Sequence, residues 1–154
     1  MDEEKISRFG CISPLDYRYS DPVAAELLSE EARIKFQAKA EAALAIALAQ
    51  QGICSREIAE EIAAACNEIR AEEVYAEEKT TKHDVRALVN CIRRRVGDSA
   101  KPFVHFCATS YDIVDTASAL RYKEACEKIV LPSLKKLEKT FIEIALREKG
   151  TLQI

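Results

Sequence analysis

Residues 109–148 read TSYDIVDTASALRYKEACEKIVLPSLKKLEKTFIEIALRE, and this stretch decides the fold. Apolar residues in its second half recur at alternating spacings of four and three, as in helices that pack along one seam. They are Val130, Leu134, Leu137, Phe141 and Ile144. The pattern predicts one helix, roughly 60 Å long at about 1.5 Å per residue, with at most one break, at Pro132. Earlier apolar residues lie on a stripe that changes phase near Ile129.

The residues before this helix predict a small helical domain. Asp21-Pro22 opens a short helical turn, and three longer helices begin at Ser29, at Ser55 and near Thr81. These helices are too short to cover the whole apolar stripe of the last one. The exposed remainder predicts either self-association or a missing part of the chain. Residues 150–154 turn extended and apolar without a cap or polar tail, which we interpret as an interruption of the chain.

The composition favours a soluble, all-α protein. Of the 154 residues, 48% are hydrophobic and 32% are charged, with only four glycines and four prolines. The net charge of −3 argues against nucleic-acid binding, and Arg93-Arg94-Arg95 fall at a predicted helix C-terminus, where they complement the dipole. No 18-residue apolar run and no apolar leader occur, so we expect neither a membrane span nor a secretory signal.

Six cysteines are scattered along the chain without the close spacing of a zinc site. Two of them, Cys66 and Cys126, fall within apolar helical stripes. We therefore expect all six to be reduced, mostly as small core residues of a cytoplasmic protein. We expect no metal site and no cofactor.

The only two histidines lie at or just before predicted helix starts. Thr81-x-x-Asp84 resembles a capping box and places His83 at about the second helical position, next to unpaired N–H groups. These groups disfavour the imidazolium form, so a neutral ring would donate one hydrogen bond and accept another. Asp84 could cap the helix and select the tautomer of the ring. A polar first-turn residue with no further role is the alternative for His83.

His105 falls in residues 103–106, which we expect to be extended, so its side chain would lie opposite those of its neighbours. Taken alone, the segment favours the alternative that His105 is a hydrogen-bonded core histidine. Thr109-x-x-Asp112 is a second capping-box-like start, where Thr109 and Ser110 offer hydroxyls and N–H groups to a carboxylate. Most such pairs only cap a helix.

Arg18 offers a planar guanidinium and Tyr19 a phenol hydroxyl, and both groups can bind a phosphate. Most such pairs are nevertheless ordinary surface residues. No phosphate-binding loop, dinucleotide fingerprint or zinc-protease motif occurs, and neither histidine has a nucleophile at a recognisable spacing. The residues alone therefore indicate an all-helical, oligomer-prone protein that binds anions.

Three stretches together closely resemble the N-terminal part of the adenylosuccinate lyase family, in the fumarase/aspartase superfamily. They are residues 13–19 (SPLDYRY), 81–85 (TKHDV) and 104–117 (VHFCATSYDIVDTA). The resemblance implies the N-terminal helical domain of that fold over residues 1–109 and the truncated start of its central helical bundle over 110–154. It also implies a homotetramer that releases fumarate by β-elimination from adenylosuccinate, giving AMP, and from SAICAR, giving AICAR.

The resemblance also implies roles for the residues singled out above. Arg18 and Tyr19 would bind the substrate phosphate, while Lys82, His83 and Asp84 would line the substrate site. His83 would orient the substrate or assist acid–base chemistry.

The second histidine segment would complete this part of the site. Thr109 and Ser110 would hold the succinyl carboxylates, and His105 would lie in or near the site. The family usually has glycine where this chain has Cys107, which puts the fit of the substrate there in doubt.

Family members are much longer, and the later segments that supply their acid histidine and base serine are absent here. We therefore expect this chain alone not to catalyse. Two alternatives stay open. One is a non-catalytic helical module that binds a partner through the stripe on residues 113–144, and the other is a carboxymuconate cycloisomerase-like enzyme of the same superfamily.

Overall fold

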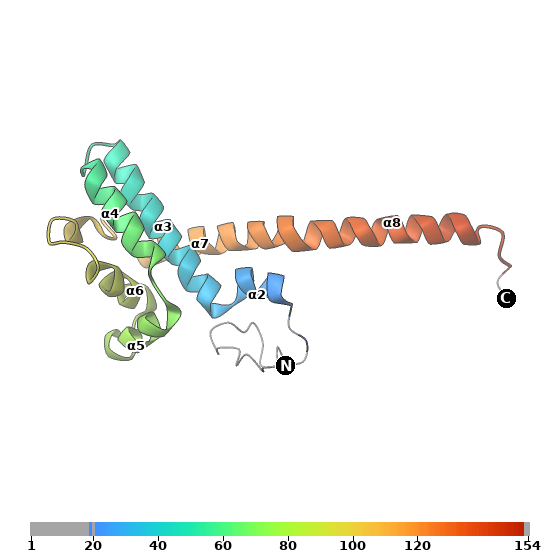
Figure 1. Cartoon of the computed structure of the whole chain (residues 1–154), viewed down its shortest axis with the longest axis horizontal. Coiled ribbons are helices and arrows are strands. Elements are labelled where there is room, and N and C mark those ends of the chain that lie inside the picture. The colour runs from blue at the N-terminus through green and yellow to red at the C-terminus, as the bar shows by residue number, and fades with distance from the viewer. Residues whose placement is uncertain (1–18, 20, 153–154) are drawn as a thin grey trace.

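A computed structural model describes Tyr19 and residues 21–152 (Figure 1). Within this part of the chain every regular element is helical and no strand occurs. The helices up to α6 gather into a compact group, and the last helices form a rod that runs away from it, as Figure 1 shows. The predicted all-α fold is confirmed.

Three helices in the described chain begin where their capping residues predicted. They are α2 (Pro22–Leu28), α3 (Glu30–Gln50) and α4 (Arg56–Asn67). Asp21, Ser29 and Ser55 each accept a backbone N–H with a side-chain oxygen, at 2.9, 3.2 and 3.3 Å. Each cap satisfies one of the N–H groups that a helix start leaves without an intrahelical partner. Gly52, just beyond α3, has a φ of 71°, which glycine adopts without steric cost.

Two helices follow, α5 (Ala71–Thr81) and α6 (Asp84–Arg93). The sequence predicted α6 but gave no helix for residues 71–81, which form α5. The Glu73 carboxylate accepts the N–H of Arg70 at 2.9 Å and closes the first turn, while Val74 is buried at 1% exposure. The chain between α6 and Gly97 forms a turn that also buries Val96.

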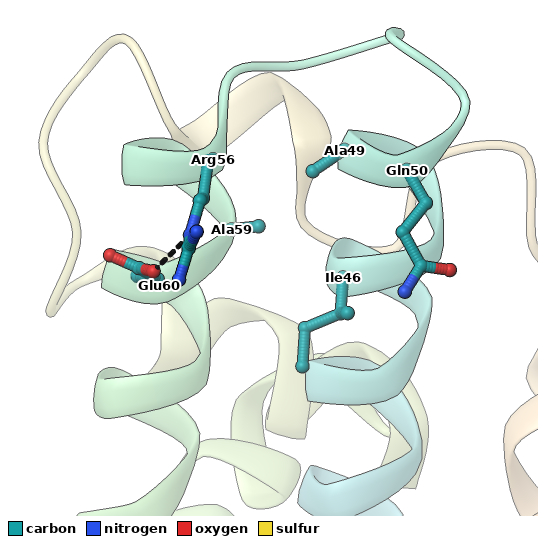
Figure 2. Close-up of a pocket in the computed structure, with 6 residues that line it drawn as sticks. All are labelled: Ile46, Ala49, Gln50, Arg56, Ala59 and Glu60. Carbon is teal, nitrogen blue, oxygen red and sulfur yellow. Dashed lines mark hydrogen bonds and ion pairs between the residues drawn. The ribbon is translucent and has the colours of Figure 1, made fainter.

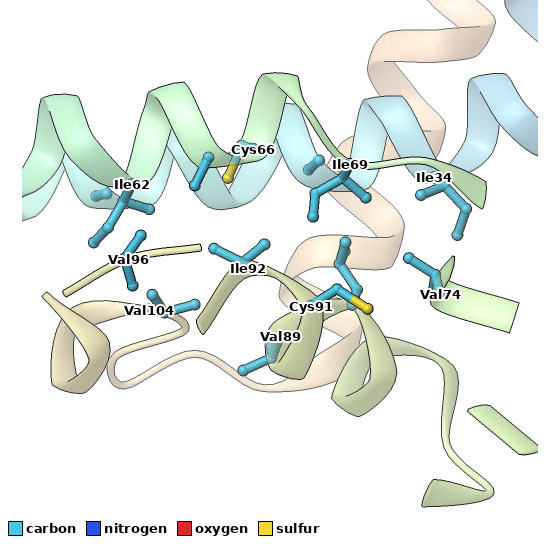
Figure 3. Packing of buried hydrophobic residues seen from close by; sticks show 14 of the residues in the cluster. Ile34, Ile62, Cys66, Ile69, Val74, Val89, Cys91, Ile92, Val96 and Val104 are labelled. Carbon is cyan, nitrogen blue, oxygen red and sulfur yellow. The ribbon is translucent and has the colours of Figure 1, made fainter. Parts of the chain in front are cut away.

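The main core lies between the α3–α4 pair and the layer formed by α5, α6 and the segment that follows them (Figure 3). Its most deeply buried large side chains are Ile34, Ile62, Val74, Val85, Leu88, Val89, Ile92 and Val104. The five cysteines described are free, as predicted, but only Cys66 and Cys91 are buried. Cys54 packs against the core from its edge, whereas Cys107 and Cys126 are exposed, so the expected core position holds for three of the five described cysteines.

The segment expected to be extended over residues 103–106 is not a strand. Lys101–Phe103 form a 3-10 helix, and the residues after it form consecutive turns. Val104 is 1% exposed, so the segment does enter the core. A short apolar run of this kind does not by itself distinguish a strand from a buried turn.

A continuous helical rod ends the described chain. Its segments are α7 (Ser110–Ala125), the π-helical segment η2 (Cys126–Val130) and α8 (Leu131–Glu148). The break predicted at Pro132 is thus a π-turn just before it, in which the N–H of Leu131 bonds to the carbonyl of Cys126. Proline has no N–H with which to close an ordinary α-turn, and a π-turn adds one residue to the helix. The added residue rotates the later apolar stripe, which explains the phase change near Ile129.

Helix α7 packs on α2 and α3, whereas α8 does not pack on the compact group. A second apolar cluster joins Leu27 and Phe36 to Ala117 and Ala125. By contrast α8, which is described in full, has no buried residue, and Leu134 and Phe141 are 54% and 61% exposed. The predicted exposure of the stripe is confirmed. Among the described residues, none of the helices combines the length and apolar character that crossing a lipid bilayer requires.

Candidate functional site

His83 caps helix α6. Its backbone is extended, with φ −152° and ψ 119°, and its imidazole Nδ1 accepts the N–H of Arg86 at 3.3 Å. The histidine therefore precedes the helix. The sequence had predicted that His83 occupies the second helical position, and that prediction is wrong. Thr81, the predicted cap, instead belongs to α5 and donates its hydroxyl to the carbonyl of His83 at 3.0 Å. An imidazole nitrogen here replaces the oxygen acceptor that most helix caps use.

Helix α7 begins with the predicted capping box. The backbone N–H of Thr109 donates to Asp112 Oδ2 at 2.8 Å, and the Thr109 side chain accepts from the third residue of the helix. Thr109 is exposed and Ser110 is half-buried. The positive end of α7 therefore lies at the surface of the molecule in an ordered conformation.

The N-termini of α6 and α7 meet. Ser110 Oγ lies 3.4 Å from His83 Nε2, although 27 residues separate them in the chain. Because Nδ1 accepts a backbone N–H, a neutral His83 ring carries its proton on Nε2 and donates toward Ser110. Two positive helix ends and an N–H donor thus converge, and this combination suits a carboxylate or phosphate.

Asp84, the first residue of α6, lies beside this junction. Its Oδ1 accepts the N–H of Val85 at 2.7 Å and is 3.4 Å from His83 Nδ1. Its Oδ2 is 3.7 Å from Nη1 of Arg33. A carboxylate at this position is favoured by the helix dipole. Asp84 therefore links the capping histidine to a cation on α3.

In the described part of the chain, three non-glycine residues have left-handed backbone conformations, and all three belong to the two histidine segments. Lys82, His105 and Cys107 have φ values of 55°, 61° and 56°. Such conformations cost an L-residue about 1–2 kcal/mol and cluster at functional sites. At Cys107, where the resemblance places glycine, the backbone keeps a conformation that glycine adopts without this cost.

His105 contacts the core through its ring. Its Nδ1 is 2.6 Å from Oε1 of Glu41, whose side chain is fully buried within α3, and its own side chain is 19% exposed. Burial raises the pKa of the Glu41 carboxyl, and the nearby His105 offsets only part of this rise. Arg93 donates to the carbonyl of Val104 at 3.2 Å and helps to hold the same turn. This geometry matches the hydrogen-bonded core histidine that the sequence left open.

The remaining predicted residues are less well placed. Lys82 ends α5 with an exposed side chain, next to His83 in the chain. Tyr19 is 76% exposed, and Arg18 lies outside the described residues. The structure therefore brings together His83, Asp84 and Ser110 with the segments that carry Lys82 and Thr109.

Sequence reasoning missed two supporting residues, Arg33 and Glu41. Glu41 is a charge within a stripe of otherwise apolar residues on α3, but the spacing of those residues does not identify this stripe as the buried one. The apolar members of that stripe are Ile34, Ala38, Ala45 and Leu48. Arg33 carried no usable signal, since only Glu30 is a local partner and both Tyr75 and Asp84 lie far away in the sequence.

A separate hollow of about 490 Å³ lies between α3 and α4 (Figure 2). Its lining residues are Ile46, Ala49, Gln50, Arg56, Ala59 and Glu60. Arg56 is paired with Glu60 at 2.7 Å, and none of the predicted site residues lines the hollow. The hollow therefore offers no unpaired positive group to an anion, unlike the junction of α6 and α7.

A protein-family model described as "Lyase" matches residues 18–154. The chain belongs to this lyase family. The crystal structure of fumarate lyase from Mesorhizobium sp. BNC1 is similar over 70% of this chain and 26% of that chain, with a TM-score of 0.61 and 28% identity. The fold is thus the all-α fold of the fumarase/aspartase superfamily.

Several relatives within the lyase family are adenylosuccinate lyases. The enzyme of Methanocaldococcus jannaschii is 39% identical over 99% of this chain and 34% of its own length. The enzyme of Archaeoglobus fulgidus is 38% identical over 92% of this chain and 31% of its own length. The enzyme of Escherichia coli K12 is 29% identical over 86% and 33%. The chain thus spans about a third of the length of these relatives.

Proposed function

We propose that this chain forms the N-terminal third of an adenylosuccinate lyase. The whole enzyme would release fumarate by β-elimination from adenylosuccinate, giving AMP, and from SAICAR, giving AICAR. The observation that carries the proposal is the convergence of His83 and Ser110 from two helix N-termini, in a chain 39% identical to an archaeal adenylosuccinate lyase. Both substrates carry a succinyl group, whose carboxylates need hydrogen-bond donors and positive charge.

In this proposal the start of α7 holds a succinyl carboxylate. The hydroxyls of Thr109 and Ser110 and the first N–H groups of the helix supply the donors. His83 donates from Nε2 and orients the substrate or assists the protonation of its departing nitrogen. Since its Nδ1 is used to cap α6, the ring serves as a donor and not as the base that removes the Cβ proton.

The other residues would complete the substrate site. Lys82 and Asp84 would line it beside His83, and Arg18 with Tyr19 would bind the substrate phosphate. His105 would support the site from behind, because its ring is engaged with Glu41.

The rest of the enzyme would come from other segments and subunits. We propose that the boundary between the first domain and the central bundle falls between residues 109 and 110, where α7 begins. The exposed apolar stripe on α8 supports self-association of the whole enzyme as a homotetramer. The free cysteines support a cytoplasmic location.

A non-catalytic helical module is the second candidate. The observation that favours it is again the stripe on α8, which a partner helix could cover without any chemistry at His83. The two candidates differ in whether substitutions at the α6–α7 junction change activity.

A chimera tests the proposed lyase function. Residues 1–154 replace the matching segment of the Methanocaldococcus jannaschii enzyme, and fumarate release from adenylosuccinate is measured. We expect turnover by the chimera and none by residues 1–154 alone. Within the chimera, His83→Gln should lower kcat/KM by about 10²-fold or more, as for loss of a group that transfers a proton.

Ser110→Ala in the chimera should mainly raise KM, because it removes a donor to a carboxylate. Arg56→Met is the control, since Arg56 pairs with Glu60 on the exposed face of α4. A chimera that is folded and assembled but releases no fumarate would contradict the proposal. Unchanged kinetics after His83→Gln would contradict the role assigned to His83.

A further inference from the structure

Arg33 connects three helices through its guanidinium group. Its Nε lies 2.8 Å from Oε2 of Glu30, one turn earlier on α3, and its Nη2 donates to the Tyr75 hydroxyl on α5 at 3.1 Å. Its Nη1 faces Oδ2 of Asp84 on α6 at 3.7 Å. The Tyr75 hydroxyl also donates to Glu30, so two of the partners are bonded to each other. Each nitrogen of the planar group thus has its own partner.

This arrangement restricts where the guanidinium can go. The Arg33 side chain is only 25% exposed, and its guanidinium carbon lies 5.9 Å from the centre of the Tyr75 ring. Glu30 and Tyr75 therefore hold the cation in place from α3 and α5. The remaining nitrogen is presented to α6, where Asp84 is 40% exposed.

Asp84 lies between two groups that compete for its carboxylate. Oδ2 faces Arg33, while Oδ1 lies 3.4 Å from His83 Nδ1. A carboxylate released from Arg33 would be free to accept a hydrogen bond from His83. That bond would require a proton on Nδ1, and the ring would then lose its bond from the N–H of Arg86.

We infer that Arg33 is a positioning residue for His83. By holding the Asp84 carboxylate, it keeps Nδ1 of His83 as the acceptor that caps α6 and keeps the proton on Nε2, which faces Ser110. This inference rests on the proposed function, in which His83 donates from Nε2 to the substrate. It adds to that function a residue on α3 that does not itself reach the junction.

The tautomer of His83 tests the inference directly. The chain has only two histidines, so ¹⁵N labelling of histidine in residues 1–154 gives two sets of ring signals. His83→Gln identifies which set belongs to which residue. The spectra are recorded at a pH about two units above the ordinary histidine pKa of ~6.5, because only a neutral imidazole has two distinguishable tautomers.

We expect the wild-type His83 signals to show Nε2–H as the main tautomer. Arg33→Met keeps much of the side-chain bulk but removes the charge, and should raise the ratio of Nδ1–H to Nε2–H by about two- to five-fold, as expected for loss of a partly exposed ion pair. Arg33→Lys keeps the charge without the planar fork and should give a smaller change. Arg56→Met, which breaks an exposed pair on α4, should give none.

An unchanged His83 tautomer ratio in folded Arg33→Met protein would overturn the inference. If that variant does not fold, Arg33→Lys and Tyr75→Phe decide, because each loosens the guanidinium more gently. An unchanged His83 tautomer ratio in both of these variants would also overturn the inference. The measurement needs no substrate and no turnover. An inactive chimera combined with a shifted tautomer would therefore count against the lyase function and leave the positioning role intact.

Discussion

Helices α6 and α8 are both amphipathic, but the apolar side of α6 is buried and that of α8 is exposed. The apolar side of α6 is covered by α4, α5 and α7, and Leu88 and Ile92 have no exposed surface. The apolar side of α8 stays uncovered, with Leu134 and Leu137 about half exposed. Amphipathicity thus predicts that a face needs a cover but does not identify the cover. For α6 the cover lies in the same chain, and for α8 the described residues contain none.

The two helices also differ in what stabilises them. Helix α6 gains stability from burial, at roughly 1.5–3 kcal/mol for each large apolar side chain removed from water. Helix α8 relies on residues of good helix propensity and on exposed pairs such as Lys139–Glu143, at 3.8 Å. Such pairs contribute only about 0.3–0.5 kcal/mol each. Because most helical stability in proteins comes from packing of an amphipathic face, α8 would be stabilised further by whatever covers it.

The largest expected effect comes from matched truncations in the two helices. Leu88→Ala on α6 should lower the free energy of unfolding by about 2–5 kcal/mol, because it removes buried methyl groups and leaves a cavity. Leu137→Ala on α8 should change it by less than about 0.5 kcal/mol in the monomer. Urea unfolding at low protein concentration measures both. Equal losses in the two variants would break the distinction between a covered and an uncovered helix.

The next largest effect concerns self-association through the exposed apolar stripe of α8. If copies of this chain cover the stripe, Phe141→Lys should weaken self-association by about tenfold or more, since burying an unpaired ammonium is costly. Sedimentation velocity over a range of concentrations gives the dissociation constant. Lys135→Gln, away from the stripe, is the control and should leave association unchanged. Unaltered association of the Phe141 variant would show that the stripe is not the contact surface.

The buried charge in the compact region predicts a pH dependence. Because burial raises the pKa of Glu41, its protonated form favours the folded state. This contribution is complete below the ordinary value of 4.5 and is lost as the pH rises through the folded pKa. Relative to Glu41→Gln, which stays neutral, wild-type stability should therefore fall as the pH rises.

Urea unfolding at a series of pH values from about 4 to 7 follows this difference. Glu143→Gln on the exposed helix α8 is the matched control for loss of a carboxylate. A constant stability difference between wild type and Glu41→Gln across this range would show that the burial of Glu41 has no effect on its ionisation.

The smallest expected effect concerns Cys107, in the turn between the compact group of helices and the rod that begins with α7. Cys107→Gly should stabilise the fold by about 0.5–1 kcal/mol, since relief of the left-handed conformation exceeds the added flexibility of glycine in the unfolded chain. Cys126→Gly is the matched control, because Cys126 has an ordinary helical φ of −61°. That change should instead destabilise by about 1 kcal/mol. Thermal unfolding gives both signs, and a destabilised Cys107→Gly would show that the thiol contributes packing.

Much of the fold follows from local chemistry and was therefore predictable. Asp21, Ser29 and Ser55 start helices because their side-chain oxygens satisfy N–H groups within three residues of them. Pro132 marks the irregular turn in the rod because it has no N–H to donate. The position of both histidines at or near helix starts was predictable for the same reason. Helix α5 was missed because most of its residues are charged or polar and only Ala71 and Val74 are buried. Two buried positions are too few to form a recognisable apolar stripe.

The choice of buried face on α3 shows where such local reasoning stops. Glu41 is buried and Ile46 is 45% exposed on the same helix. Its apolar residues lie on nearly all sides, so their spacing does not specify which side faces the core. The packing of α4 and α7 against α3 decides it.

By itself the sequence determined where helices begin, that a long apolar stripe needs a cover, and that two segments could bind an anion. Only the tertiary structure decided that the His83 ring meets Ser110 and that Arg33 reaches Asp84. The physical reason is that caps and periodicity act within a few residues along the chain, whereas these two contacts join residues 27 or more positions apart. Such residues meet only when whole helices pack, and that packing depends on every buried side chain at once.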